Sequence, residues 1–325
     1  MKIIAKYLFT FICATLVANF FVYFYYSPAV QVPNHDKFTD LKSMPSTHNP
    51  HGDEGYGNIT IDEYGFNNIL GISPAEAETI FIGSSQTEAQ HVASNENFVY
   101  LLNQERPETK VYNMGVSAST FQSTFYRIPY LVTACPNAKT LVFEINNMPS
   151  PDDLEKVKNI MDSGNIQEKD ISWKAGNTFL TTAGKITLVR LLWRQFDHYR
   201  RGKKPKNQQK GNFDKDKYLA LLEDILAKGK AQAGDVNIMI FYLAKLDLCQ
   251  DASVEIAAGN NESELFKQAC DKNGIVYMDM GSYFQEAYDS QHVLPYGFLN
   301  SPIGTGHLNI YGHRIIAKAF SDIIR

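Results

Sequence analysis

The chain has 325 residues, with 31 basic and 35 acidic side chains and a formal net charge of −4. Hydrophobic residues make up 44% and charged residues 20%, which is typical of a globular protein and excludes a disordered or collagen-like chain. The slight acidic excess argues against a nucleic-acid partner, which would require a basic surface. Four cysteines are too few for a disulfide scaffold, and no Cys/His cluster has zinc spacing, so we expect no metal site.

Residues 1–26 predict a membrane anchor. The uncharged run from Tyr7 to Tyr26 would form a helix about 30 Å long, which matches the thickness of the hydrocarbon layer. Lys2 and Lys6 precede this run and the next basic residue is Lys37, so the positive-inside rule places the N-terminus in the cytoplasm. The rest of the chain would then lie in the periplasm or at the cell surface. The alternative is a cleaved signal peptide, whose apolar region is normally about 7–15 residues long.

Residues 27–57 are rich in Pro, His, Asn, Ser and Asp, a composition typical of a linker. We therefore expect this segment to join the anchor to a domain that covers residues 58–325.

The domain shows strands alternating with helices. Apolar runs predict buried strands at 79–83, 110–113, 140–145, 236–243 and 275–280, and helical spacing marks 98–105, 121–132, 218–233, 262–273 and a closing helix at 311–324. This alternation predicts an α/β fold, a three-layer sandwich with a central parallel sheet of about five strands flanked by helices. Ligands of such sheets bind at the carboxyl ends of the strands.

Residues 149–217 interrupt this alternation and predict an insertion, because connections of that length are uncommon. The insertion contains a predicted helix at 186–199 and then a basic patch of Arg200, Arg201, Lys203, Lys204, Lys206 and Lys210. The patch is either a solvated loop or a contact surface for an anionic glycan or lipid head groups. Beyond it, Cys249 and Cys270 could pair or remain free thiols.

Four polar or flexible residues follow the predicted strands. Ser85 comes directly after the first strand, Gly115 and Asn146 come at the ends of the next two, and His307 precedes the closing helix. A serine becomes a nucleophile when a base lies within hydrogen-bond reach, and backbone or amide N–H groups can stabilise the anion that develops. Each residue also has a structural explanation, as a helix cap, a turn glycine, a loop-capping asparagine or a solvated histidine.

Taken together and in this order, these residues resemble the four motif blocks of the SGNH (GDSL-like) hydrolase superfamily, especially its membrane-anchored bacterial members. Four segments carry the resemblance: Tyr64-Gly65-Phe66-Asn67, Thr87-Glu88, Asn113-Met114-Gly115-Val116 and His307-Leu308-Asn309 with Gly312-His313-Arg314. The resemblance implies a Ser85 nucleophile, a His307 base, an oxyanion hole of Ser85, Gly115 and Asn146, and no metal or organic cofactor.

Three positions depart from the family pattern. Ser84 replaces the Asp of Gly-Asp-Ser, a form similar to D-alanyl transfer proteins, and Glu144 stands where many members have Gly. The family also has an Asp two or three residues before the histidine, where this chain has Thr305 and Gly304. A backbone carbonyl, Thr305 or Asp279 could support His307 instead, or catalysis could be weak or lost.

His313 is the rival base. His91 is expected to be a surface group, and His198 is expected to have no catalytic part.

The resemblance leaves three functions open. The first is an extracytoplasmic, membrane-anchored serine hydrolase or O-acyltransferase that acts on O-acyl groups, above all acetyl, of a cell-surface polysaccharide. A transferase would need an acyl donor, often delivered by a multi-pass membrane acyltransferase partner. The second function is a general esterase or lipase, which would use the same acyl-ester chemistry. The third is a non-catalytic member that binds glycan or scaffolds an acyltransferase complex.

Overall fold

A computed structural model describes residues 2–164, 188–189, 191–193, 196, 214–248, 254–256, 261–301 and 303–324. Its central sheet has five parallel strands in the order β11-β8-β7-β5-β6. The strands are β5 (Thr79–Gly83), β6 (Val111–Gly115), β7 (Thr140–Ile145), β8 (Asn237–Tyr242) and β11 (Val276–Asp279). The prediction of a five-stranded parallel sheet is confirmed. These strands are continuous apolar runs because helices cover both faces of the sheet.

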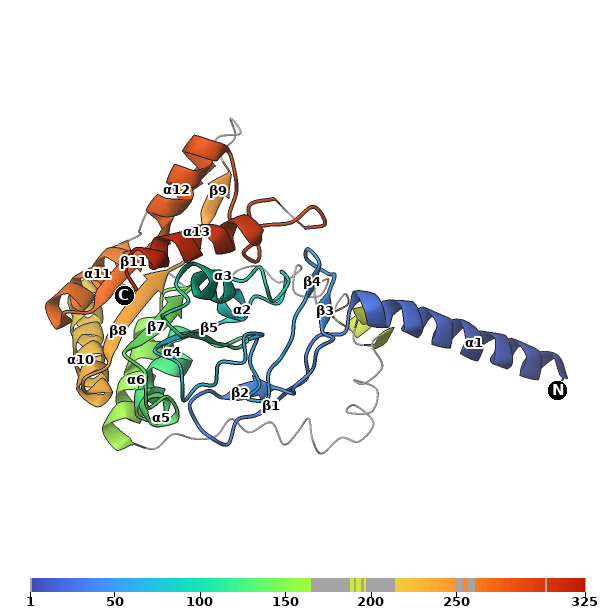
Figure 1. Cartoon of the computed structure of the whole chain (residues 1–325), viewed down its shortest axis with the longest axis horizontal. Helices are drawn as coiled ribbons and strands as arrows, with labels where there is room; N and C mark the ends of the chain where they lie inside the picture. The colour runs from blue at the N-terminus through green and yellow to red at the C-terminus, as the bar shows by residue number, and fades with distance from the viewer. Residues whose placement is uncertain are drawn as a thin grey trace.

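The helices form two layers around this sheet (Figure 1). One layer contains α3 (Phe98–Glu105), α12 (Met280–Gln291) and α13 (Ile310–Ser321), and α13 packs against both of the others. The other contains α4 (Phe121–Thr124), the 3-10 turn η1 (Phe125–Arg127), α5 (Ile128–Ala134), α6 (Pro151–Ser163), α10 (Lys215–Ala233) and α11 (Asn261–Asn273). The three-layer sandwich is therefore confirmed.

Aromatic side chains fill the core between the sheet and the α3–α13 layer. Phe81 on β5 is fully buried, and its ring meets Phe98 of α3 at 5.0 Å and Phe320 of α13 at 4.9 Å, both edge to face. Phe241 on β8 closes the cluster at 6.0 Å from Phe81. This packing fixes α13, and with it the loop that precedes α13, on the sheet.

Several elements were not predicted, among them α6, which lies inside the insertion predicted at 149–217. Helix α12 begins at Met280, immediately after β11, where the predicted strand still continued. A short antiparallel hairpin of β9 (Leu246–Leu248) and β10 (Val254–Ile256) follows β8. The helix predicted at 186–199 is only partly among the described residues, and the basic patch at 200–210, His198 and Cys249 lie outside them.

The N-terminal helix α1 (Lys2–Tyr25) is a single rod that leaves the domain (Figure 1). With 24 residues and a mean hydropathy of 1.8 in its most apolar window, it is long and apolar enough to cross a membrane. None of that window is buried against the rest of the protein.

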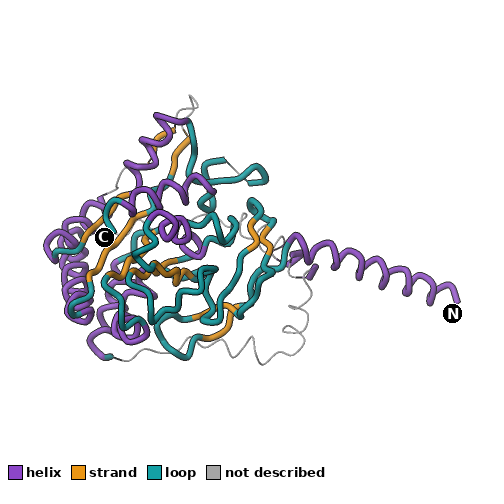
Figure 2. The backbone as a smooth tube through the Cα atoms, in the orientation of Figure 1, coloured by secondary structure: helices purple, strands orange, loops and turns teal. Residues whose placement is uncertain are grey.

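The linker predicted at 27–57 is folded onto the domain, which corrects that prediction (Figure 2). It forms two antiparallel pairs, β1 (Gln31–Pro33) with β2 (Leu41–Ser43) and β3 (Pro50–His51) with β4 (Gly57–Asn58). The buried Arg127 of the domain forms an ion pair with Asp40 and donates a hydrogen bond to the Lys37 carbonyl. The buried Asn34 and Asn49 side chains are satisfied internally, so a polar composition here accompanies burial rather than solvation.

Phe81→Ala should lower the free energy of unfolding by about 3–5 kcal/mol, because it removes a fully buried ring and leaves a cavity among three others. Denaturant unfolding of the detergent-solubilised full chain, followed by circular dichroism, measures this change. Tyr283→Ala is the control, since Tyr283 is 37% exposed and should cost far less. Equal losses in the two variants would contradict the proposed position of Phe81 in the core.

Candidate active site

The turn after β5 presents two serines with different environments. Ser84 is the N-cap of α2 (Ser85–Glu88), and its Oγ accepts from the Gln86 N–H at 3.2 Å. Ser85 is the first residue of this helix and is only partly buried. Its N–H has no hydrogen-bond partner among the described residues, as is usual for the first turn of a helix. Ser85 therefore offers a hydroxyl and a free backbone donor at the carboxyl edge of the sheet.

Glu144 of β7 supports this turn from below. Its Oε2 accepts from the N–H groups of Ser84 at 3.1 Å and Thr87 at 3.0 Å, and both hydroxyls of these residues also donate to its carboxyl group. Complete burial raises the pKa of Glu144, and these hydrogen bonds oppose the rise. The carboxyl group that the family pattern has at position 84 is thus supplied here from the neighbouring strand.

His307 reaches Ser85 from the loop before α13. Its Nε2 lies 2.9 Å from the Ser85 Oγ, within hydrogen-bond distance. The Gln86 side chain holds this loop on both sides of the histidine: it donates to the Gly306 carbonyl at 3.1 Å and accepts from the Leu308 N–H at 2.8 Å. The sequence-based pairing of residues 85 and 307 therefore corresponds to a direct contact in space.

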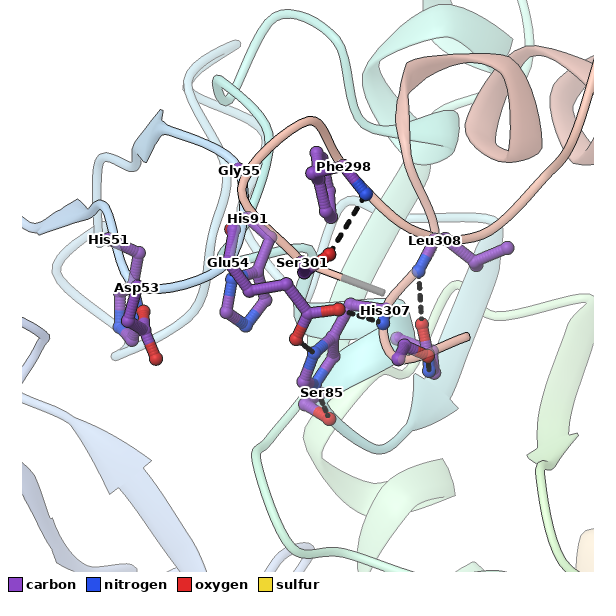
Figure 3. Close-up of polar contacts among 12 residues, drawn as sticks. His51, Asp53, Glu54, Gly55, Ser85, His91, Phe298, Ser301, His307 and Leu308 are labelled. Atoms are coloured by element: carbon purple, nitrogen blue, oxygen red, sulfur yellow. Dashed lines mark hydrogen bonds and ion pairs between the residues drawn. The ribbon is translucent and has the colours of Figure 1, made fainter. Parts of the chain in front are cut away.

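Glu54 provides the carboxylate that orients His307 (Figure 3). One oxygen, Oε2, lies 2.7 Å from His307 Nδ1, and the other, Oε1, accepts from the His307 N–H at 2.7 Å. Burial would raise the pKa of Glu54, but the hydrogen bonds and charge of His307 outweigh burial and hold it below its usual range. Glu54, His307 and Ser85 thus form a continuous carboxylate–imidazole–hydroxyl chain.

Gly306 is needed for this close approach. It has a φ of +86°, and a Cβ at this position would lie 1.9 Å from the Glu54 Oε1. Any other residue would therefore push the carboxylate away from the histidine.

The supports expected for His307 are replaced by Glu54. Asp279 instead caps α12, with its Oδ1 accepting from the Gly281 N–H at 2.8 Å. Thr305 is exposed and lines the pocket beside the site. The sequence signal for Glu54 was slight, since it consisted only of an Asp-Glu pair within the stretch interpreted as a linker.

His91 is buried behind this chain and not at the surface, which corrects the prediction from sequence. Its ring stacks on His307 with centroids 4.0 Å apart, and its Nδ1 bonds to the Glu54 carbonyl at 2.8 Å. Burial, with the nearby charge of His307, lowers the pKa of His91 to about 3, so it packs as a neutral ring.

His91 also belongs to two clusters of side chains that could bind a metal ion, the two found among the described residues. One is His51, Asp53 and His91, the other is Glu54, His91 and His307, and in each the ligand atoms lie within 4.8 Å of one another. The second group shares Glu54 and His307 with the carboxylate–imidazole–hydroxyl chain, whose hydrogen bonds already use both His307 ring nitrogens and both Glu54 oxygens. The absence of a resident metal remains a prediction.

Gly115 does not offer its N–H to a ligand, which corrects that assignment. The N–H donates to the Asn113 Oδ1 at 2.8 Å, and a Cβ on Gly115 would lie 2.2 Å from the Glu88 backbone nitrogen. The glycine therefore permits β6 to pack against α2. Three residues further along, Ala118 is exposed with a φ of 67°, and its N–H has no partner among the described residues. Strained backbone of this kind is characteristic of functional loops.

Asn146 lies at the end of β7 beside the serine turn. Its Nδ2 donates to the Ser84 Oγ at 2.9 Å, and the residue borders a pocket of about 280 Å³. Gln86, Tyr296, Thr305 and Gly306 line the same pocket, and Lys245 is the charged residue among its described lining. The pocket adjoins both Ser85 and His307 through their sequence neighbours, and amide groups supply much of its polarity.

His313, the rival base, is buried inside the α3–α13 layer. Its Nδ1 accepts from the Phe98 N–H at 3.4 Å, and its ring stacks on Phe98 at 5.7 Å. Complete burial lowers its pKa to about 3. It therefore serves the packing of α13 and does not contact Ser85.

No protein-family model and no curated protein matches the sequence. Similar solved structures include an acetyl xylan esterase, AlAXEase, at 15% identity and a TM-score of 0.43, covering 76% of this chain and 100% of that one. A member of the lipolytic protein G-D-S-L family from Veillonella parvula DSM 2008 has 11% identity and a TM-score of 0.40, covering 76% of this chain and 97% of that one. A putative lipolytic protein of the G-D-S-L family from Desulfitobacterium hafniense DCB-2 has 10% identity and a TM-score of 0.39, covering 76% of this chain and 98% of that one. Two of these three structures are named as members of the G-D-S-L family, whose motifs the sequence resembles. At these identities and TM-scores the similarity assigns no activity to this chain.

Glu54→Gln should reduce the reactivity of Ser85 by about 10²–10⁴-fold, because the amide no longer stabilises an imidazolium or selects the reactive tautomer of His307. The rate of labelling by a fluorophosphonate probe measures this reactivity in the full chain. Asp279→Asn is the matched control and should label at the wild-type rate once folded protein is quantified. The assignment fails if the two variants show the same rate.

His313 should make stability depend on acid pH. Its unfolded pKa is about 6.5 and its folded pKa about 3, so the unfolded chain binds the extra proton and stability falls as pH drops through this interval. His313→Leu should remove a slope of up to about 1.4 kcal/mol per pH unit from the unfolding free energy between about pH 4 and 6. An unaltered slope in His313→Leu would refute the account.

Proposed function

We propose that the protein is a serine acyl-ester hydrolase or O-acyltransferase, anchored in a membrane by α1, that acts through an acyl-enzyme on Ser85. The single observation that carries this proposal is the Glu54–His307–Ser85 chain, with contacts of 2.7 and 2.9 Å. An isolated serine is a weak nucleophile, and a serine aligned with an imidazole and a carboxylate has the arrangement that activates it.

The proposed reaction follows from this geometry. His307 Nε2 takes the Ser85 proton as Oγ attacks the acyl carbonyl, and the imidazolium is stabilised by Glu54 through Nδ1–H. The resulting C–O bond gives a tetrahedral oxyanion, which collapses to the acyl-serine as His307 passes the proton to the leaving alcohol. Water or an acceptor hydroxyl, deprotonated by His307, then releases the acyl group and restores Ser85.

Three donors are proposed for the oxyanion. They are the N–H of Ser85, the side-chain amide of Asn146, and the N–H of Ala118 in place of Gly115. The first and third have no partner among the described residues, and the Asn146 amide donates to the Ser84 Oγ, directly beside Ser85 in the chain. Removing one such donor typically costs about 10²–10³ in rate.

The proposed substrate is an O-acyl group, above all acetyl, on a cell-surface polysaccharide. The anchor helix supports an extracytoplasmic location for the domain, and the amide-lined pocket of about 280 Å³ is suited to hydroxyl-rich ligands. Hydrolysis requires water alone, whereas transfer requires an acyl donor and therefore a membrane acyltransferase partner that delivers it. A general esterase is the second candidate, because the same three residues would serve any accessible ester. The complete relay argues against a purely scaffolding role.

Ser85→Ala should abolish covalent labelling by a fluorophosphonate probe and the release of acetate from acetylated polysaccharide, because no other serine of the described residues contacts His307. Ser84→Ala is the neighbouring control: it weakens the turn but should retain labelling. Acetyl esters formed on an added polysaccharide acceptor, with a matching fall in free acetate, would favour transfer, and acetate release independent of acceptor would favour hydrolysis. Full ester turnover by purified Ser85→Ala would overturn the assignment.

A further inference from the structure

We propose that the face next to the end of α1 lies on the surface of the bilayer that holds α1, so that the Ser85 site opens at the level of the lipid head groups. This inference rests on the proposed membrane anchoring. It adds an orientation for the domain and a loop that inserts into the bilayer interface.

The end of α1 is attached directly to the segment that carries Glu54. The Tyr25 hydroxyl donates to the Gly52 carbonyl, and the Tyr56 hydroxyl donates to the Phe24 carbonyl at 3.0 Å. A side chain on Gly52 would collide with the Tyr25 ring, its Cβ lying 2.4 Å from Cε2. The anchor thus ends in contact with residues 52–56, and its end cannot move away from the site without disturbing Glu54.

The loop before His307 is fastened to the same segment and carries exposed apolar side chains. Asn300 donates to the carbonyls of Gly52 at 3.0 Å and Gly55 at 3.1 Å, and it accepts from the Gly55 N–H at 2.6 Å. Leu299, beside it, is fully exposed, and Ile303 is 66% exposed. Figure 1 shows this loop, which precedes α13, on the side of the domain from which α1 leaves.

A second apolar element lies along α1 itself. The Leu188 N–H donates to the Asn19 Oδ1 of α1 at 3.1 Å, which places this helical piece beside the anchor. The described residues that follow expose large apolar side chains, namely Leu192, Trp193 and Phe196, at 60%, 69% and 57%. If α1 crosses a membrane, side chains held beside it would be surrounded by lipid rather than water.

The bilayer is the occupant that fits all three observations. Leucine, isoleucine and tryptophan gain free energy by entering the interface, and aromatic residues at the end of a spanning helix mark its depth. Tyr23, Phe24 and Tyr25 supply that aromatic end, and the Tyr23 ring stacks on His48 of the domain at 4.4 Å. The loop of Leu299 leads directly into His307, so docking would bring the reactive groups to the level of the lipid head groups.

The test measures the depth of residue 299 in lipid. The full chain is changed at its two tryptophans to phenylalanine (Trp173→Phe and Trp193→Phe), and a single tryptophan is introduced as Leu299→Trp. The protein is reconstituted in nanodiscs made with or without lipid brominated near the head of the acyl chain. We expect at least a roughly twofold loss of fluorescence in the brominated discs, because an interfacial side chain lies within about 5–10 Å of the boundary.

Val276→Trp in the same background is the matched control. Val276 is 47% exposed and begins β11, at the far edge of the sheet from the anchor, and its fluorescence should be equal in the two kinds of disc. Quenching at 299 no greater than at 276 overturns the inference and leaves this face to a protein partner.

Two further readouts separate this inference from the proposed function. Flotation of the discs reports anchoring by α1, and fluorophosphonate labelling of Ser85 reports a competent site. If labelling persists while residue 299 stays unquenched, the orientation is wrong and the chemistry stands. If residue 299 is quenched while Ser85 is inert, the proposed function fails and the docking stands.

Discussion

The contact between Glu54 and His307 is the constraint on which the rest of the site depends. Both carboxylate oxygens are used, one on the ring and one on the backbone of the same residue, so the imidazole is fixed in rotation as well as position. This arrangement requires a glycine at 306, a folded N-terminal segment, and a loop fastened by Gln86 on either side of the histidine. The hydroxyl of Ser85 then meets a ring nitrogen whose direction is already determined.

The sheet could be predicted from the sequence because its strands are continuous apolar runs, and α13 could be predicted because its apolar spacing follows Asn309, whose side chain caps it. Ser85, Asn146 and His307 could be located because parallel strands bring their carboxyl ends to one edge. Glu54 could not, since a carboxylate 253 positions away from its histidine leaves no local pattern. Composition also does not separate buried, hydrogen-bonded Asn and His side chains from solvated ones, which is why it predicts a linker at residues 27–57.

The departures from the family pattern are related to one another in space. Ser84 stands where the family pattern has an Asp, so the serine turn has no carboxyl group at that position. Glu144 of β7 supplies one instead and accepts hydrogen bonds from the same turn. Thr305 removes the acid before the histidine and Glu54 supplies one from a distant segment. In both cases a carboxyl group is present, but it comes from a different part of the chain. Gly115 shows the opposite case, in which the residue matches the motif but its N–H is already bonded to Asn113.

The folding of residues 27–57 onto the domain has a practical consequence for handling the protein. A soluble version cut at residue 58, where composition alone would place the boundary, would retain the whole sheet and all of the recognisable motifs. It would nevertheless lack the partner of the imidazole and would expose Arg127 without its aspartate. Inactivity of such a fragment would reflect the truncation and not the chemistry of Ser85. A soluble fragment for activity assays should therefore begin before β1.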